Sequence, residues 1–361
     1  MIQNIEIQFF QILQYSIGAS EKMPVISSEE WELLYKIARQ QSLLGVLFYG
    51  IQKNGIEKPN KKLLFKWYSI SENIKKGNIK ANQVAVELSQ FFQKNGFRTC
   101  ILKGQGNTLN YPDPYIRNCG DIDIWLEGGY DKIMSFINTK WKGMLQRYHH
   151  VDIPNYNGVS VEVHFTPSYM YSFTANKRLQ KWFAEQEDMQ FSHVVELPNH
   201  VGTISVPTLD FNIIYQLDHI YKHVFSEGIG LRQLMDYYFL LHNGLNSVNK
   251  DSITQQLKFL GLYKFAGAVM YVMQEVFALD PQCMITEPNK REGEFLLKEI
   301  LVGGNFGKYD TRLGSKDKEG KIHRYFRMTL RNLRFVFHYP SEALSEPLFR
   351  TWCFFRKVWN R

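Results

Sequence analysis

The chain has 361 residues, of which 44% are hydrophobic and 15% aromatic, a composition that supplies a large apolar core and excludes an intrinsically disordered protein. Its formal net charge is +8, and most of that excess lies in residues 321–361, which hold nine Lys and Arg against two Glu. The four cysteines form no CxxC pair, no basic segment leads into an apolar stretch at the N-terminus, and no apolar run approaches roughly 18 residues, so we expect a cytoplasmic protein without a signal peptide or membrane span.

Residues 1–97 are expected to be helical. A capping pattern at Ser28, followed by acids and by apolar residues at helical spacing, marks the start of one helix. The segment 61–96 has the amphipathic periodicity of a long helix that ends at Gly96. Gly77 lies inside this segment, so the helix is either continuous or broken there.

Short strands are expected in the middle of the chain. Residues 97–104 ("FRTCILKG") form the first, a short helix follows, and residues 121–126 ("DIDIWL") form the second. A turn and a helix lead to two further strands, 143–154 and 158–165, which are joined by the turn sequence "NYNG". Residues 166–205 have a mixed pattern that allows short strands near its end.

From Thr208 onward the chain is expected to be helical again. The predicted helices span 208–225, 231–243, 250–260, 262–278 and 293–301, and two basic, aromatic helices at 322–338 and 341–359 follow a loop. We therefore predict an α+β fold. A small mixed β-sheet core at 98–206 is flanked by extensive helical regions at 1–97 and 207–361.

Two carboxylates lie two positions apart in the strand "DIDIWL". Residues i and i+2 of a strand point to the same face, so Asp121 and Asp123 project together while Ile122 and Ile124 face the core. The same alternation in "VSVEVHF" places Glu162 and His164 on a polar face. If the two strands are neighbours in one sheet, three carboxylates converge.

Three converging carboxylates predict a metal site. Left unpaired, they repel one another and raise each other's pKa, and a divalent cation removes that repulsion. Mg²⁺ prefers oxygen ligands and leaves room for phosphate oxygens, and two such ions can assist an in-line phosphoryl displacement. In "ILKGQGN", a strand ending at Gly104 presents backbone N–H groups to an anion, and Lys103 and Arg117 supply cationic partners for a triphosphate.

The segments "LKG", "YPDPYIRNCGDIDIWL", "VEVHF" and "GIGLRQLMD" together resemble the nucleotidyltransferase superfamily. The resemblance is strongest to an uncharacterised bacterial branch with Leu-Lys-Gly and Arg-x-x-x-Asp-Ile-Asp motifs, and it covers about residues 30–245. It implies the polymerase-β-like fold, with Asp121 and Asp123 as metal ligands. It also implies Glu162 as the third carboxylate, with a role in deprotonating the acceptor, and Gly104 with Gln105 at the nucleotide phosphates.

Two departures from the family pattern bear on catalytic rate. Better-characterised members have Gly-Ser where this chain has Gly104-Gln105, so a phosphate-binding hydroxyl is absent. The third acid is Glu162, where Asp is common.

Structural roles are open for several of these residues. Asp121 could cap the preceding loop while Asp123 pairs with Arg117, or Arg117 could pair with Asp113 or Asp121. His164 could orient a carboxylate, touch substrate or be a structural histidine.

A helix with His219 and His223 at i, i+4 has a spacing that could bind zinc, but packing or a hydrogen bond between helices is favoured. The resemblance extends to this region, and there we predict that His219, His223, Arg232 and Asp236 line or support the far wall of the cleft.

The C-terminal tail, residues 321–361, interleaves Arg with aromatic residues. This pattern is consistent with weak contact with RNA or an anionic membrane. The favoured alternative is a helical hairpin whose aromatic side chains pack inward and whose arginines are solvated.

The predicted function is a nucleotidyltransferase that depends on Mg²⁺ or Mn²⁺. It would move a nucleoside monophosphate from a nucleoside triphosphate (NTP) to an acceptor hydroxyl and release pyrophosphate. The acceptor could be a protein, a small molecule, a sugar or RNA. The alternatives are a catalytically degenerate nucleotide-binding or regulatory module of the same fold, and a scaffold bound to RNA or membrane through its tail.

Overall fold

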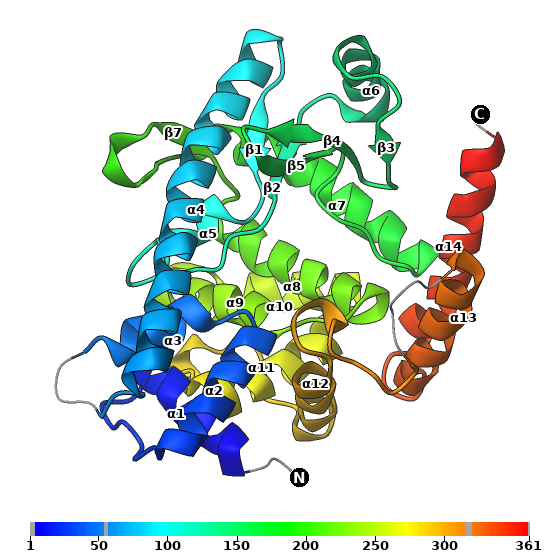
Figure 1. Cartoon of the computed structure of the whole chain (residues 1–361). Coiled ribbons are helices and arrows are strands. Elements are labelled where there is room, and N and C mark those ends of the chain that lie inside the picture. Colours follow the sequence, from blue (N-terminus) through cyan, green and yellow to red (C-terminus); the bar gives the residue numbers. More distant parts are fainter. Residues whose placement is uncertain (1–3, 54–56, 315–319, 360–361) are drawn as a thin grey trace.

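The computed structural model describes residues 4–53, 57–314 and 320–359 and has the predicted α+β fold (Figure 1). A small sheet lies between helices at the upper end of the molecule in this view, and the remaining helices form a large bundle beneath it. Most of the apolar core belongs to that bundle, and a second, smaller core lies on one face of the sheet.

Four helices precede the sheet, as expected: α1 (Asn4–Ile17), α2 (Ser28–Gln40), α3 (Leu44–Ile51) and α4 (Lys61–Lys94). The N-cap of α2 is Ser27, one residue before the predicted start, and it forms a capping box with Glu30. Helix α4 is continuous through Gly77. A Cβ atom at Gly77 would lie 2.8 Å from the Cys119 Sγ, so this glycine allows close packing and does not break the helix.

Five strands form the main sheet in the order β1-β2-β5-β4-β3. They are β1 (Thr99–Ile101), β2 (Ile122–Leu126), β3 (Leu145–Gln146), β4 (His150–Tyr156) and β5 (Val159–His164). The predicted neighbours β2 and β5 pair in parallel, and the other pairs are antiparallel. The predicted turn between β4 and β5 has φ of +48° at Asn157 and +78° at Gly158, as a two-residue type I′ hairpin requires.

The two faces of the sheet have different surroundings. Ile122, Ile124 and Leu126 pack into the smaller core with α4 and with α6 (Gly129–Lys140). Trp125 points to the opposite face and contacts Phe191 of α7 (Phe173–Ser192). Helix α7 was not predicted, whereas the short strands expected after it are present as β6 (Val194–Glu196) and β7 (Thr203–Ser205).

The predicted C-terminal helices are present. They are α8 (Leu209–Ser226), α9 (Leu231–Gly244), α10 (Lys250–Leu260), α11 (Tyr263–Phe277), α12 (Lys290–Gly303), α13 (Lys321–Asn332) and α14 (Pro340–Trp359). The short helix expected between the first two strands is present as α5 (Gln105–Thr108). Within the described ranges, none of the helices combines the length and apolar character needed to cross a membrane. The region boundaries at 97/98 and 206/207 stay predictions, and α4 contacts both α3 and the strands β1 and β2.

Candidate active site

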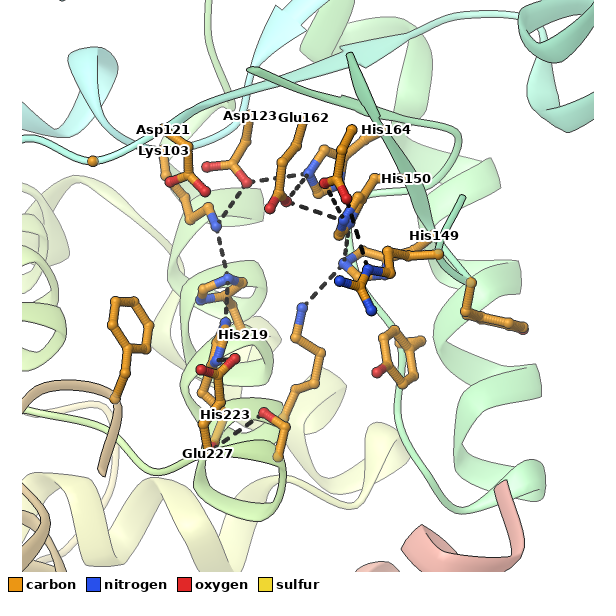
Figure 2. Close-up of a pocket in the computed structure, with 18 of the residues that line it drawn as sticks. Lys103, Asp121, Asp123, His149, His150, Glu162, His164, His219, His223 and Glu227 are labelled. Carbon is orange, nitrogen blue, oxygen red and sulfur yellow. Dashed lines mark hydrogen bonds and ion pairs between the residues drawn. The ribbon is translucent and has the colours of Figure 1, made fainter. Parts of the chain in front are cut away.

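Acidic side chains line up across three neighbouring strands, on the face of the sheet that borders a cavity shared with α8. The register places Asp123 of β2 opposite Glu162 of β5, and Glu162 opposite Asp152 of β4. Neighbouring strands lie roughly 4.7–4.9 Å apart, so the three carboxylates form one row. His164 and His150 are opposed one step further along the same face (Figure 2).

Asp123 is buried between a lysine and a histidine. The Lys103 Nζ lies 3.0 Å from Asp123 Oδ1, and the His164 Nε2 lies 3.1 Å from the same oxygen. Burial by itself raises the pKa of Asp123, but the Lys103 charge and the His164 hydrogen bond outweigh burial and hold this pKa well below its usual range. Asp123 is therefore ionised at neutral pH, and its partner is Lys103 instead of Arg117.

Glu162 shares the same histidine. Its Oε2 lies 3.4 Å from His164 Nε2 and 3.3 Å from His150 Nδ1. Burial raises the pKa of Glu162, but these imidazoles outweigh burial and lower it to about 2. Burial lowers the pKa of His164, whereas its hydrogen bonds to Asp123 and Glu162 raise it above the usual value. His164 thus bridges two carboxylates and orients both.

Asp121 lies just before β2 and faces the same cavity, beside Lys103 (Figure 2). The Asp123 charge raises the pKa of Asp121 to about 6, burial adds to this effect, and Lys103 opposes it. The repulsion between Asp121 and Asp123 that the sequence predicts is therefore present, and Lys103 balances it only in part.

Three overlapping groups of side chains could hold a metal ion, with ligand atoms within 4.8 Å of one another in each group. They are Asp123-Glu162-His164, His150-Asp152-Glu162 and His149-His150-His164. Of the predicted ligands, Asp123 and Glu162 are members. Asp121 lines the cavity but belongs to none of these groups, which are the ones formed within the described part of the chain.

The cavity has a volume of about 950 Å³ and lies between the sheet, α8, α9 and the C-terminal helices. Predicted site residues along its wall are Lys103, Gly104, Arg117, Asp121, Asp123, Glu162, His164, His219, His223, Arg232 and Asp236. Tyr148, Tyr169 and Phe349 line it as well, together with Arg324 and Arg350 of the tail. The structure therefore brings segments that are far apart in the sequence to one cavity.

Helix α8 supplies a chain of hydrogen bonds opposite the carboxylate row. The Lys103 Nζ lies 2.7 Å from His219 Nε2, which lies 3.1 Å from His223 Nε2 (Figure 2). Burial lowers the pKa of both histidines well below the usual value, and the nearby lysines lower it further, so both are neutral. These contacts favour the hydrogen-bonding role over zinc binding.

Arg117 and Asp236 form a buried ion pair. Arg117 Nε and Nη2 lie 2.7 and 2.8 Å from the two carboxylate oxygens of Asp236, and the Tyr111 hydroxyl donates to the same carboxylate at 2.6 Å. Asp113 and Asp121 are therefore not the principal partners of Arg117. Arg232 behaves differently: it donates to the Asn118 carbonyl at 3.0 Å, and no carboxylate among the described residues lies within ion-pair distance of it.

A family model of an uncharacterised nucleotidyltransferase matches residues 27–278, more than half of the chain. The chain belongs to this family. No curated protein and no solved structure gives a match. The match confirms the resemblance that the motifs indicated, and it assigns nucleotidyltransferase activity, as a class, to the chain.

Of the two residues predicted to contact the nucleotide phosphates, Gly104 and Gln105, only Gly104 lines the cavity. Gly104 has φ of +55°, in the region that favours glycine, and lines the cavity. The Gln105 side chain is buried and donates to Asn82 and to the Asn78 carbonyl of α4. The predicted phosphate contact of Gln105 can therefore come from its backbone only, since its amide faces away from the cavity.

Among the lining residues of the cavity that were not predicted are His149, His150, Asp152 and Lys222. The segment "HHVD" gave a usable signal, because His150 and Asp152 alternate in a strand as Asp121 and Asp123 do. Lys222 Nζ lies 3.2 Å from His149 Nε2. Burial and the Lys103 charge lower the pKa of Lys222 to about 8.

Proposed function

We propose that the chain transfers a nucleoside monophosphate from a Mg²⁺- or Mn²⁺-bound NTP to an acceptor hydroxyl and releases pyrophosphate. The observation that supports it is the row of carboxylates that shares one cavity with cations suited to phosphate. Family membership gives the class of reaction. The metal, the direction of transfer and the acceptor, whether a protein, a small molecule, a sugar or RNA, are parts of the proposal.

The donor set fits a divalent cation. Asp121 and Asp123 offer oxygens whose mutual repulsion a cation would relieve, and Glu162 with a pKa of about 2 is ionised at neutral pH. His164 holds Asp123 and Glu162 in place, and their carboxylate oxygens suit Mg²⁺ and Mn²⁺ alike. A cation held by these residues would supply positive charge against the phosphate oxygens of the triphosphate.

The cations of the cavity would bind the triphosphate. Lys103 neutralises Asp123 and can turn to a phosphate oxygen when a metal takes over that role. Lys222 and Arg232 lack a carboxylate at ion-pair distance within the described part of the chain, so they are better placed for phosphate than Arg117. The phosphate roles of Lys103, Gly104 and Arg117 remain proposals.

Replacing Arg232 by Met is expected to weaken NTP binding by about ten- to a hundredfold, because a hydrogen bond to a charged group contributes about 1.5–3 kcal/mol. Titration calorimetry with the preferred NTP measures the effect. Lys181→Met, which removes a solvent-exposed cation of α7, is the matched control and should leave the affinity unchanged. Equal affinity of wild type and the Arg232 variant would contradict the assignment.

The first experiment is thermal unfolding of wild type and of the Asp121→Asn/Asp123→Asn variant, with Mg²⁺ and each of the four NTPs. A ligand at a hundred times its Kd adds about 2.7 kcal/mol of stability. A metal-dependent shift in wild type alone supports the proposal and identifies the base. No shift with any NTP contradicts it.

The second candidate is the catalytically degenerate module. The buried amide of Gln105, where better-characterised members of the superfamily have a serine hydroxyl, is the observation that favours it. A nucleotide-dependent shift without pyrophosphate release from any acceptor would support it. Contact of residues 321–361 with RNA or an anionic membrane is a separate proposal.

A further inference from the structure

Phe306 has a backbone conformation that bulky side chains avoid. It lies in the short 3₁₀ turn Asn305–Gly307 that follows α12, with φ of +54° and ψ of +31°. In this left-handed region the Cβ atom crowds the neighbouring carbonyl oxygen, so a bulky residue is found there only where its surroundings impose the conformation. The fold therefore holds Phe306 in this position at an energetic cost.

Close backbone packing imposes this conformation. A Cβ atom at Gly228 would lie 3.2 Å from the Gly307 Cα, and one at Gly230 would lie 2.8 Å from the Asn305 Cα. Because both positions between α8 and α9 are glycine, the turn packs directly against the backbone of that connection. The conformation of Phe306 is thus fixed by its neighbours in space.

The Phe306 ring belongs to the cavity wall and not to the core. It lines the cavity and is a member of neither apolar core. Among the described residues, His223 supplies the one aromatic ring in contact with it, at a centroid distance of 5.5 Å. By contrast, Tyr148, Tyr169 and Phe349 of the cavity pack on one another at centroid distances of 5.0–5.2 Å. Strain that serves no core packing is typical of functional positions.

The ring lies beside the cations that are proposed to bind the triphosphate. The Arg232 Cζ lies 5.6 Å from the centroid of the Phe306 ring. His223, which contacts the same ring, is linked through His219 to Lys103 (Figure 2). A nucleotide whose phosphates contact Arg232 can place its base on Phe306, since one ribose joins the base to the phosphates.

We propose that Phe306 is the stacking platform for the base of the NTP and that it contributes to nucleotide preference. This inference rests on the proposed function. Each nucleobase has a π-face that stacks on an aromatic ring, and the larger face of a purine gains more from stacking than that of a pyrimidine. Phe306 lies beyond residue 278, where the family match ends, so the family motifs gave no signal for it.

A positioning role is the alternative. Phe306 could hold the Arg232 guanidinium through a cation–π contact, and its loss would then weaken phosphate binding whatever the base. Inorganic tripolyphosphate carries the phosphates of an NTP without a base, so it separates the two roles. Stacking predicts that only nucleotides lose affinity, whereas positioning predicts an equal loss for tripolyphosphate.

The test is titration calorimetry of the full chain with the preferred NTP and with tripolyphosphate, both in the presence of Mg²⁺. The Phe306→Ala variant is expected to bind the NTP at least about fivefold more weakly, the lower limit for the loss of one base–aromatic stack. Its affinity for tripolyphosphate should be unchanged. Thermal unfolding without ligand should match wild type, since the ring belongs to neither core.

Three further variants sharpen the test. Phe306→Tyr keeps an aromatic ring and should bind the NTP like wild type. Phe306→Leu keeps an apolar side chain without a π-face and should bind as weakly as Phe306→Ala. The control is Phe259→Ala, which removes a half-exposed ring of α10 that does not line the cavity, and its NTP affinity should be that of wild type.

Several outcomes would overturn the inference. They are equal NTP affinity of wild type and Phe306→Ala, wild-type affinity of Phe306→Leu, or an equal loss of NTP affinity in the control variant. An equal loss for tripolyphosphate in the Ala and Leu variants would make Phe306 a positioning residue for Arg232. Wild type that binds no NTP would overturn the proposed function together with this inference, whereas wild type that binds and an unaffected Phe306→Ala variant would overturn this inference alone.

Discussion

The Asp123→Asn variant is expected to transfer nucleotide at least about a thousandfold more slowly than wild type. Asn has the shape of Asp and can still accept from Lys103 and His164, but it has no charge to hold a divalent cation. The Lys103 charge and the His164 hydrogen bond hold the pKa of Asp123 well below its usual range, so Asp123 is ionised through the whole neutral range. Release of pyrophosphate from the NTP that stabilises wild type measures the effect.

Asp152→Asn is the matched control for this prediction. Asp152 belongs to the same row, opposite Glu162, but it lies on β4 at the far side from Asp121. It should lose only about ten- to a hundredfold of the activity, the range typical of groups that support metal ligands. Equal losses in the two variants would move the metal centre toward His150, and an active Asp123 variant would contradict the proposal.

The alternation of polar and apolar residues made the centre of the site predictable. In "DIDIWL" and "VEVHF" one face is apolar, and that face is buried against α4 and α6, so the carboxylates had to face the other side. Parallel pairing of β2 and β5 then places Asp123 beside Glu162. Local periodicity was sufficient here because both strands have one clearly apolar face.

Other parts of the site depend on contacts that local patterns do not contain. Arg117 and Asp236 are 119 positions apart, and nothing near either residue specifies the pairing. Asp152 and His150 became site residues through the register of β4 on β5. In α13, the spacing of Ile322 and Phe326 predicts a shared face, but periodicity alone does not tell whether that face meets the core or solvent.

Replacing Asp236 by Ala is expected to lower the free energy of unfolding by about 3–5 kcal/mol, because it leaves the Arg117 guanidinium buried without a counter-charge. Arg117 and Asp236 are only 5% and 6% exposed, so water replaces the lost partner poorly. The Tyr111 hydroxyl also loses its acceptor. Urea unfolding measures the change, and the exposed pair of Lys181 and Glu185 is the control, with an expected change within about 1 kcal/mol.

The double variant Arg117→Met/Asp236→Leu is expected to recover most of that stability, since apolar side chains of similar volume can replace a buried ion pair. A double variant as unstable as Asp236→Ala would contradict the ion-pair argument. Because it is expected to fold, it also separates the two roles considered for Arg117. Unchanged NTP affinity in the double variant would make Arg117 a structural residue that holds α9 against the loop before β2. A loss of affinity comparable to that of Arg232→Met would show that the guanidinium contacts phosphate while Asp236 positions it.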